Sequence, residues 1–284
     1  MIDKSLDTLK AAIRKRRSVR TYQKVKLKPE DKQFIESILS EAQTIKGPFN
    51  HTIEVLDLIE QPSSSKEKIG TYGFIKNAPA FIVGATKNNI EHLIDFGYVF
   101  EWIILNLTDH NLGSVWLGGT FRRIQFEKFL DSKDAFIPAI TPVGYPKEKM
   151  SFREQALRGV VQAKSRKPLN EIIFEVPSMQ GFKRTKDPKL AKIFDMVRFG
   201  PSASNNQPWR FYIDKNIVHV YLAYDESYNN KLHYDIQYLD IGASLCHLEI
   251  GLKTHDFTFK TVHSPFKNAQ QNEYYIISYK IKAH

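Results

Sequence analysis

Two short basic clusters are the residues of this sequence whose chemistry most directly suggests a ligand. The chain has 284 residues, with 41 Lys and Arg against 31 Asp and Glu and a formal net charge of +10. Much of the excess lies in the segment that ends in Arg16-Arg17-Ser18-Val19-Arg20 and in Lys164-Ser165-Arg166-Lys167. Each cluster alone also fits a solvated charged surface. Together, two guanidinium groups and an ammonium group could hold one phosphate dianion.

The same net charge could serve an anionic polymer such as nucleic acid. Such a partner would require basic side chains spread along a stripe, because a nucleic-acid backbone presents many phosphates in a row. Here the basic residues form two compact clusters. We therefore expect a small anionic ligand and no nucleic-acid partner.

A polar loop is the second candidate for ligand contact. It runs Gly200-Pro201-Ser202-Ala203-Ser204-Asn205-Asn206-Gln207-Pro208-Trp209. Glycine and two prolines exclude regular structure, while the Ser, Asn and Gln side chains offer many hydrogen-bonding groups to a flat heteroaromatic edge. A plain turn between a helix and a strand is the alternative.

The segment Trp116-Leu117-Gly118-Gly119 is a third candidate. Its bare glycine backbone would let a planar ring approach, although a simple turn at the end of a strand gives the same pattern.

Apolar periodicity predicts the elements that must position these residues. The predicted helices cover residues 5–16, 29–42, 91–110, 124–130 and 190–197, and a further long apolar helix starts near Asp240. The predicted strands cover residues 53–58, 80–85, 114–119, 137–143, 209–213, 217–222 and 274–279, with 164–176 extended.

The order of these elements indicates an internal duplication. Gly47-Pro48 ends a helix as Gly200-Pro201 does, an offset of 201−48 = 153, and Asp95 opens an apolar helix as Asp240 does, an offset of 240−95 = 145. The difference is close to the length of a Ser-rich segment, residues 61–68, in the first half only. We predict two halves, residues 1–160 and 161–284, that pack as one unit. Only the first has the Arg-Arg-Ser and Gly-Gly segments, and only the second has the full polar loop.

Composition excludes several other classes of protein. No apolar run approaches the roughly 20 residues of a membrane span, and the N-terminus lacks the apolar region of a secretory signal. The single cysteine, Cys246, is expected to be a buried thiol. These features predict a cytoplasmic protein without a membrane partner. No metal-ligand spacing, nucleophile elbow or GxGxxG motif is present.

Taken together, these segments, with Gly113-Ser114-Val115 before the Trp-Leu-Gly-Gly turn and with Gly144-Tyr145-Pro146, resemble the nitroreductase family of FMN-dependent oxidoreductases. The resemblance is to the branch in which two nitroreductase-like halves are fused in one chain, and it covers nearly the whole sequence. It implies an α+β nitroreductase-like fold, with a central, mostly antiparallel sheet flanked by helices, built as an internal pseudo-dimer. The chain would act as a monomer that keeps one flavin site.

The resemblance also implies the roles of individual residues. The basic segments would hold the phosphate and ribityl chain of FMN, the Gly-Gly turn would border the flavin ring, and the polar loop would close over the site from the other half. The implied cofactor-binding residues are Arg16, Arg17, Ser18, Arg20, Leu117, Gly118, Gly119, Lys164, Arg166, Pro201, Ser202, Ala203, Ser204 and Asn206. Lys76 is the nearest candidate for the N1–C2=O edge of the flavin. No catalytic side chain is expected, because flavin N5 carries the chemistry.

The implied activity is electron transfer from NADH or NADPH, through FMN, to a small-molecule acceptor such as a nitroaromatic or a quinone. The alternative is a flavin-binding or flavin-sensing protein without significant turnover.

Overall fold

The computed structural model describes residues 2–62, 69–127, 135–147, 165–176, 178–181, 188–227, 232–266, 269 and 272–284, with side chains from residue 6 onward. The predicted boundary between the halves, at residue 160, lies outside these ranges, as does Lys164.

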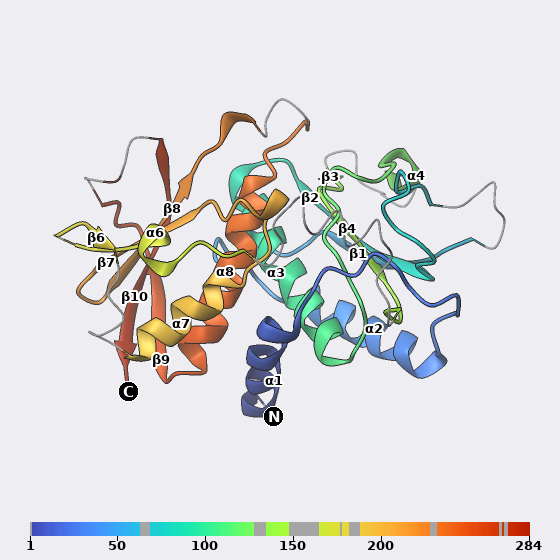
Figure 1. The fold of residues 1–284 in the computed structure, drawn as a ribbon, viewed down its shortest axis with the longest axis horizontal. Coiled ribbons are helices and arrows are strands. Elements are labelled where there is room, and N and C mark those ends of the chain that lie inside the picture. Colours follow the sequence, from blue (N-terminus) through green and yellow to red (C-terminus); the bar gives the residue numbers. More distant parts are fainter. Residues whose placement is uncertain are drawn as a thin grey trace.

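The described elements form two sheets with helices packed between them (Figure 1). The helices are α1 (Ile2–Lys15), α2 (Pro29–Ala42), α3 (Ile90–Asp109), α4 (Ile124–Glu127), α6 (Leu169–Ile172), α7 (Pro188–Arg198) and α8 (Gln237–Lys253), with a 3-10 turn, η1 (Ala203–Asn205). The strands are β1 (Val55–Glu60), β2 (Ala80–Lys87), β3 (Ala135–Phe136), β4 (Ile140–Val143), β5 (Ile173–Glu175), β6 (Gln180–Gly181), β7 (Trp209–Asp214), β8 (Ile217–Ala223), β9 (Phe257–Val262) and β10 (Glu273–Ala283).

Each sheet belongs to one part of the chain. The first has the order β1-β2-β3, with β4 also paired to β2, and the second has the order β6-β5-β7-β8-β10-β9. Antiparallel pairing prevails in both, and the β5–β7 pair is parallel. The α+β class with mostly antiparallel strands and flanking helices is thus confirmed. The strands divide into two sheets because α3 and α8 lie between them and bury apolar side chains on all sides.

The central helices α3 and α8 cross at two glycines. A Cβ added to Gly97 would lie 2.3 Å from the carbonyl oxygen of Leu239, and one added to Gly242 would lie 2.0 Å from that of Ile94. Each pair of equivalent positions differs by the same offset, 242−97 = 239−94 = 145. A two-fold axis between the predicted halves would give this reciprocal contact. Only glycine allows the two backbones to approach so closely.

Several elements differ from the sequence-based predictions. Residues 114–119 form isolated bridges, Ser18 with Ser114 and Leu117 with Ile140, and not a strand. The segment expected to be extended up to residue 176 contains the helical turn α6 before β5. Cys246 is buried on α8, as predicted. Among the described helices, none has the length and apolarity needed to cross a membrane.

Candidate functional site

A cavity of about 330 Å³ brings together residues that are far apart in the sequence. Its volume lies at the lower end of the range of small-molecule sites. Its walls come from the segment after α1, the Trp116–Thr120 turn, Arg166, the polar loop and the start of α8. The lining residues are Arg16, Arg17, Ser18, Arg20, Phe74, Val115, Trp116, Leu117, Gly118, Gly119, Thr120, Arg166, Pro201, Ser202, Ala203, Ser204, Asn205, Ile236, Leu239, Asp240 and Ala243.

Twelve of the predicted site residues line this cavity. They are Arg16, Arg17, Ser18, Arg20, Leu117, Gly118, Gly119, Arg166, Pro201, Ser202, Ala203 and Ser204. Asn206 is not among the lining residues; its amide donates to Asp225 Oδ2 at 3.5 Å, and Asn205 takes its place on the wall. Lys164 lies outside the described residues.

A second, larger cleft of about 1570 Å³ lies beside residues 24–33 and 69–79. Of the candidates from the sequence, it contains only Lys76, which does not line the smaller cavity. The smaller cavity is therefore the better candidate site, since twelve of the predicted residues line it and Lys76 alone lines the larger cleft.

Arginine side chains give one end of the cavity its charge. The Arg16 side chain is only 8% exposed, and its Nε lies 3.6 Å from Glu101 Oε1. Among the described residues, none accepts a hydrogen bond from that Nε. Arg166 donates to Asn205 Oδ1 and, at 3.5 Å, to the carbonyl oxygen of Phe199. Arg16 and Arg166 both line the cavity, and guanidinium groups bind anions through charge-assisted hydrogen bonds, so this end of the cavity is suited to an anion.

Electrostatics at Arg166 support the same conclusion. Burial and, to a smaller extent, the positive charges of Arg16 and Arg198 lower the pKa of Arg166 to about 10, while Glu101 acts in the opposite direction. Like charges held together in a partly desolvated site favour the binding of a compact dianion, because the anion relieves their repulsion. The residues present therefore fit a phosphate group.

The polar loop has a strained backbone. Ser204, Asn205 and Gln207 all have positive φ angles, 49°, 60° and 51°. Non-glycine residues rarely adopt this conformation, which costs free energy and persists only where surrounding contacts hold it.

Hydrogen bonds within the loop and to two neighbouring segments hold it in that conformation. Asp240 on α8 accepts from the Ala203 N–H at 3.0 and 3.1 Å. Ser202 Oγ accepts from the Gln207 N–H at 2.9 Å, and Gln207 Oε1 accepts from the Lys167 N–H at 3.0 Å. The loop is thereby attached both to the central helix and to the second basic cluster.

The Gly-Gly turn forms the facing wall. Leu117 and Ile140 exchange two backbone hydrogen bonds of 3.0 Å, which fix the turn to the end of the first sheet. A Cβ added to Gly118 would lie 2.5 Å from Ile236 Cδ1, so the turn packs directly against the start of α8. The Gly118 carbonyl oxygen accepts from Tyr234 Oη at 3.2 Å and from Arg123 at 3.1 Å. The turn thus contacts Tyr234 and Ile236, which belong to the part of the chain that forms the second sheet.

The sequence did not indicate every residue on the wall. Ile236, Leu239 and Ala243 follow an apolar helical pattern and were indistinguishable from core residues. Phe74 lies in a loop without a recognisable motif, yet it lines the cavity and is 41% exposed. The sequence indicates Asp240 only as the start of a helix, and its equivalence to Asp95, which starts the other long apolar helix, is the available signal.

The fold and the site describe an α+β protein with an arginine-lined cavity between two parts of its chain. The sequence model of the family described as "Putative TM nitroreductase" matches residues 8–252. The chain belongs to this nitroreductase family, and its general class is that of an oxidoreductase.

A solved structure gives the same fold. A putative nitroreductase from Thermotoga maritima superposes with a TM-score of 0.57 at 19% identity, covering 95% of this chain and 91% of that chain. A nitroreductase family protein from Clostridium difficile has a TM-score of 0.42 at 21% identity and covers 58% of this chain and 94% of its own. A nitroreductase with bound FMN from Bacteroides fragilis has a TM-score of 0.40 at 14% identity, covering 51% of this chain and 91% of its own. The search of curated protein sequences found no significant relative.

Proposed function

We propose that this protein is an FMN-dependent oxidoreductase that passes electrons from NADH or NADPH to a nitroaromatic, quinone or similar acceptor. The observation that carries the proposal is the meeting of Arg16, Arg166 and the polar loop around one cavity. Membership of the nitroreductase family supports the same activity.

The residues divide into three roles in this proposal. The arginines and Ser18 would hold the FMN phosphate and ribityl chain, since all of them line the cavity. Leu117, Gly118 and Gly119 would border the flavin ring. Pro201 to Ser204 would close the site from the other side, and Asn205 would replace Asn206 in that contact.

Bound FMN would supply the hydride and electron transfer. The chain's own part is to bind, orient and partly shield the cofactor, and it needs no side chain that acts as an indispensable acid or base. Phe74, which is exposed at the cavity, would contact a planar acceptor or the nicotinamide.

We further propose that the chain is a pseudo-dimer of residues 1–160 and 161–284 with one flavin per chain, acting as a monomer in the cytoplasm. The reciprocal Gly97 and Gly242 contacts support this arrangement. The basic segment comes from the first half and the polar loop from the second, and so the halves complement each other at a single site.

Arg166→Ala tests the proposal in binding. It should weaken FMN affinity about 10- to 100-fold, since a charge-assisted hydrogen bond to an anion contributes about 1.5–3 kcal/mol. The matched control is Lys15→Ala, because Lys15 is a nearby cation whose Nζ donates to Asn111 Oδ1 at 2.7 Å and does not line the cavity. Equal FMN affinity in both variants would contradict the assigned phosphate site.

Turnover separates an enzyme from a flavin sensor. With FMN bound, the protein should oxidise NADH or NADPH when menadione or a nitroaromatic is added. Stable FMN binding with negligible oxidation of either donor would instead support the flavin-sensing alternative.

A further inference from the structure

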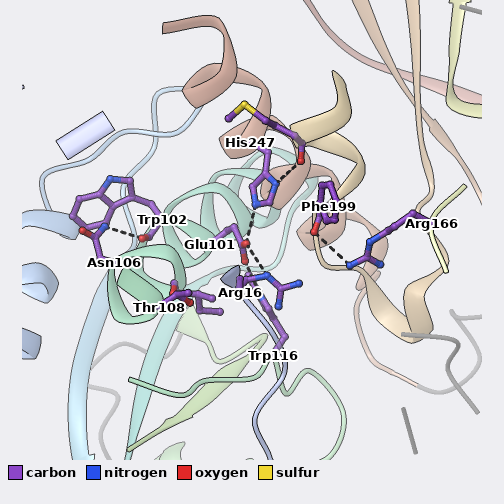
Figure 2. Close-up of polar contacts among 11 residues, drawn as sticks. Arg16, Glu101, Trp102, Asn106, Thr108, Trp116, Arg166, Phe199 and His247 are labelled. Atoms are coloured by element: carbon purple, nitrogen blue, oxygen red, sulfur yellow. Dashed lines mark hydrogen bonds and ion pairs between the residues drawn. The ribbon is translucent and has the colours of Figure 1, made fainter. Parts of the chain in front are cut away.

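A fully buried carboxylate behind the cavity connects two of its walls. Glu101 on α3 accepts a hydrogen bond from Trp116 Nε1 at 2.8 Å, and its Oε1 lies 3.6 Å from Arg16 Nε. Trp116 and Arg16 both line the cavity, whereas Glu101 does not. Figure 2 shows Glu101 between the His247 ring and the Arg16 side chain. Glu101 can therefore act on a ligand only through its neighbours.

His247 on α8 supplies the remaining contact. Its Nε2 lies 2.9 Å from Glu101 Oε1, and its Nδ1 lies 3.1 Å from the carbonyl oxygen of Met196. Both His247 and Glu101 have fully buried side chains. The pair joins the central helix of the first half to that of the second.

The two hydrogen bonds of His247 fix the number of protons on the pair. A carbonyl oxygen can only accept, so Nδ1 carries a proton. The short Nε2–Oε1 contact requires a second proton between the ring and the carboxylate. Whichever atom holds that second proton, the Glu101–His247 pair has no net charge.

This neutrality matters to Arg16. An isolated Glu101 carboxylate would cancel the positive charge of Arg16 and oppose the binding of a phosphate. A carboxylate balanced by His247 still offers an oxygen that orients the guanidinium group, and it leaves the charge of Arg16 available to an anion.

We propose that Glu101, charge-balanced by His247, is a positioning residue that fixes Arg16 and Trp116 at the cavity wall and thereby sets the affinity for the flavin phosphate. This inference rests on the proposed FMN site. It adds a link between that site and the contact of α3 with α8.

Comparing FMN with riboflavin tests the inference, because riboflavin has the same ring and ribityl chain but no phosphate. Glu101→Gln should weaken FMN binding about tenfold and leave riboflavin binding unchanged within about twofold. The glutamine can satisfy both Trp116 and a neutral His247, but its amide NH2 then faces Arg16 Nε and repels it. Dissociation constants come from quenching of flavin fluorescence.

His247→Gln is the second variant, since it keeps a donor to Glu101 but removes the balancing proton. It should also weaken FMN selectively, by about tenfold, because Glu101 then cancels the charge of Arg16. In an Arg16→Ala background, Glu101→Gln should change FMN affinity less than about twofold.

The control is Glu249→Gln. Glu249 is another buried carboxylate, on α8, and accepts from the Tyr98 and Tyr279 hydroxyls at 2.9 and 3.0 Å without lining the cavity. Its replacement should leave the ratio of FMN to riboflavin affinity unchanged. Equal losses for both flavins in Glu101→Gln and His247→Gln, or no loss for either, would overturn the inference. Wild-type protein that binds neither flavin would instead refute the proposed function.

Discussion

Both carboxylate oxygens of Asp240 accept the backbone N–H of Ala203, at 3.0 and 3.1 Å, so the polar loop is attached to the first turns of α8. A matching contact lies earlier in the chain, where Asp95 on α3 accepts the N–H groups of Phe49 and His51, each at 2.9 Å. A buried aspartate thus anchors a loop to each of the two central helices. Of these two loops, only the polar loop contributes Ser and Asn side chains to the cavity wall.

Asp240→Ala should release the polar loop and reduce FMN affinity about tenfold, because the Ala203 N–H loses its buried acceptor and the positive φ at Ser204 is no longer supported. Asp240→Asn keeps one acceptor oxygen and should retain affinity within about threefold. Titration of both variants with FMN checks this. Equal FMN affinities in Asp240→Ala and Asp240→Asn would show that the Asp240 contact does not hold the loop in its binding form.

Asp95 should make stability depend on pH. Burial raises its pKa from 3.8 to about 6, and the N–H groups of Phe49 and His51 only partly offset that effect. The folded protein therefore keeps a proton that the unfolded chain releases, and this stabilisation is lost as pH rises from about 4 to about 6. Because Asp95 is only 1% exposed, the full effect amounts to about 3 kcal/mol.

Asp95→Asn removes this titration. Its free energy of unfolding, relative to the wild type, should rise between pH 4 and pH 7 by up to about 3 kcal/mol. Urea denaturation at the two pH values measures the change, and a constant difference between variant and wild type would contradict the prediction. A constant offset from one lost N–H acceptor does not affect this comparison.

The long helices and most strands are predictable from the sequence, because long apolar periodic segments such as α3 and α8 have few alternatives. The loops that meet at the cavity are predictable too, since their side chains are unusual for plain turns. Glu101 and His247 are not, because a single charged residue in an apolar helix is ordinarily assigned to the exposed face. Their pairing depends on how α3 and α8 cross, which no local pattern encodes.

The sequence predicts Asn206 on the cavity wall, whereas Asn205 lies there. This difference also depends on geometry that no local pattern encodes. Which of two adjacent side chains faces a ligand is decided by the positive φ angles of the loop, 49° at Ser204 and 60° at Asn205. Composition predicts a turn but not these angles. The division into two sheets also depends on the placement of the central helices, and not on strand propensity.

The crossing of α3 and α8 predicts two severe substitutions. Gly97→Ala and Gly242→Ala should each destabilise the protein by about 3 kcal/mol, since the new Cβ would meet the backbone carbonyl oxygens of Leu239 and Ile94. Alanine is otherwise the better helix former, so the cost comes from the contact. Chemical denaturation measures both variants.

Gly119→Ala is the control, because its Cβ would approach only the tip of the Leu232 side chain, at 3.0 Å, which can rotate away. It should cost less than about 1 kcal/mol. Helix variants no less stable than this control would show that α3 and α8 do not approach as closely as described.

Phe74→Ala should raise the KM for aromatic acceptors about 2- to 10-fold, which corresponds to the loss of one aromatic contact. Phe74 is 41% exposed and lines the cavity, whereas the nearby Tyr72, 63% exposed, lines only the larger cleft. Tyr72→Ala should therefore leave the KM unchanged. Phe74→Tyr, which keeps an aromatic ring, should have the KM of the wild type. Steady-state assays with menadione and a nitroaromatic distinguish these outcomes, and equal effects at positions 72 and 74 would refute the role of Phe74.

Titration of the flavin-free protein with FMN is the most direct test of the central claim, that the two parts of this chain complete one flavin site. We expect saturable quenching of flavin fluorescence at one FMN per chain, with the affinity weakened about 10- to 100-fold in Arg166→Ala and kept in Lys15→Ala. Absence of binding, or saturation at two FMN per chain, would contradict it.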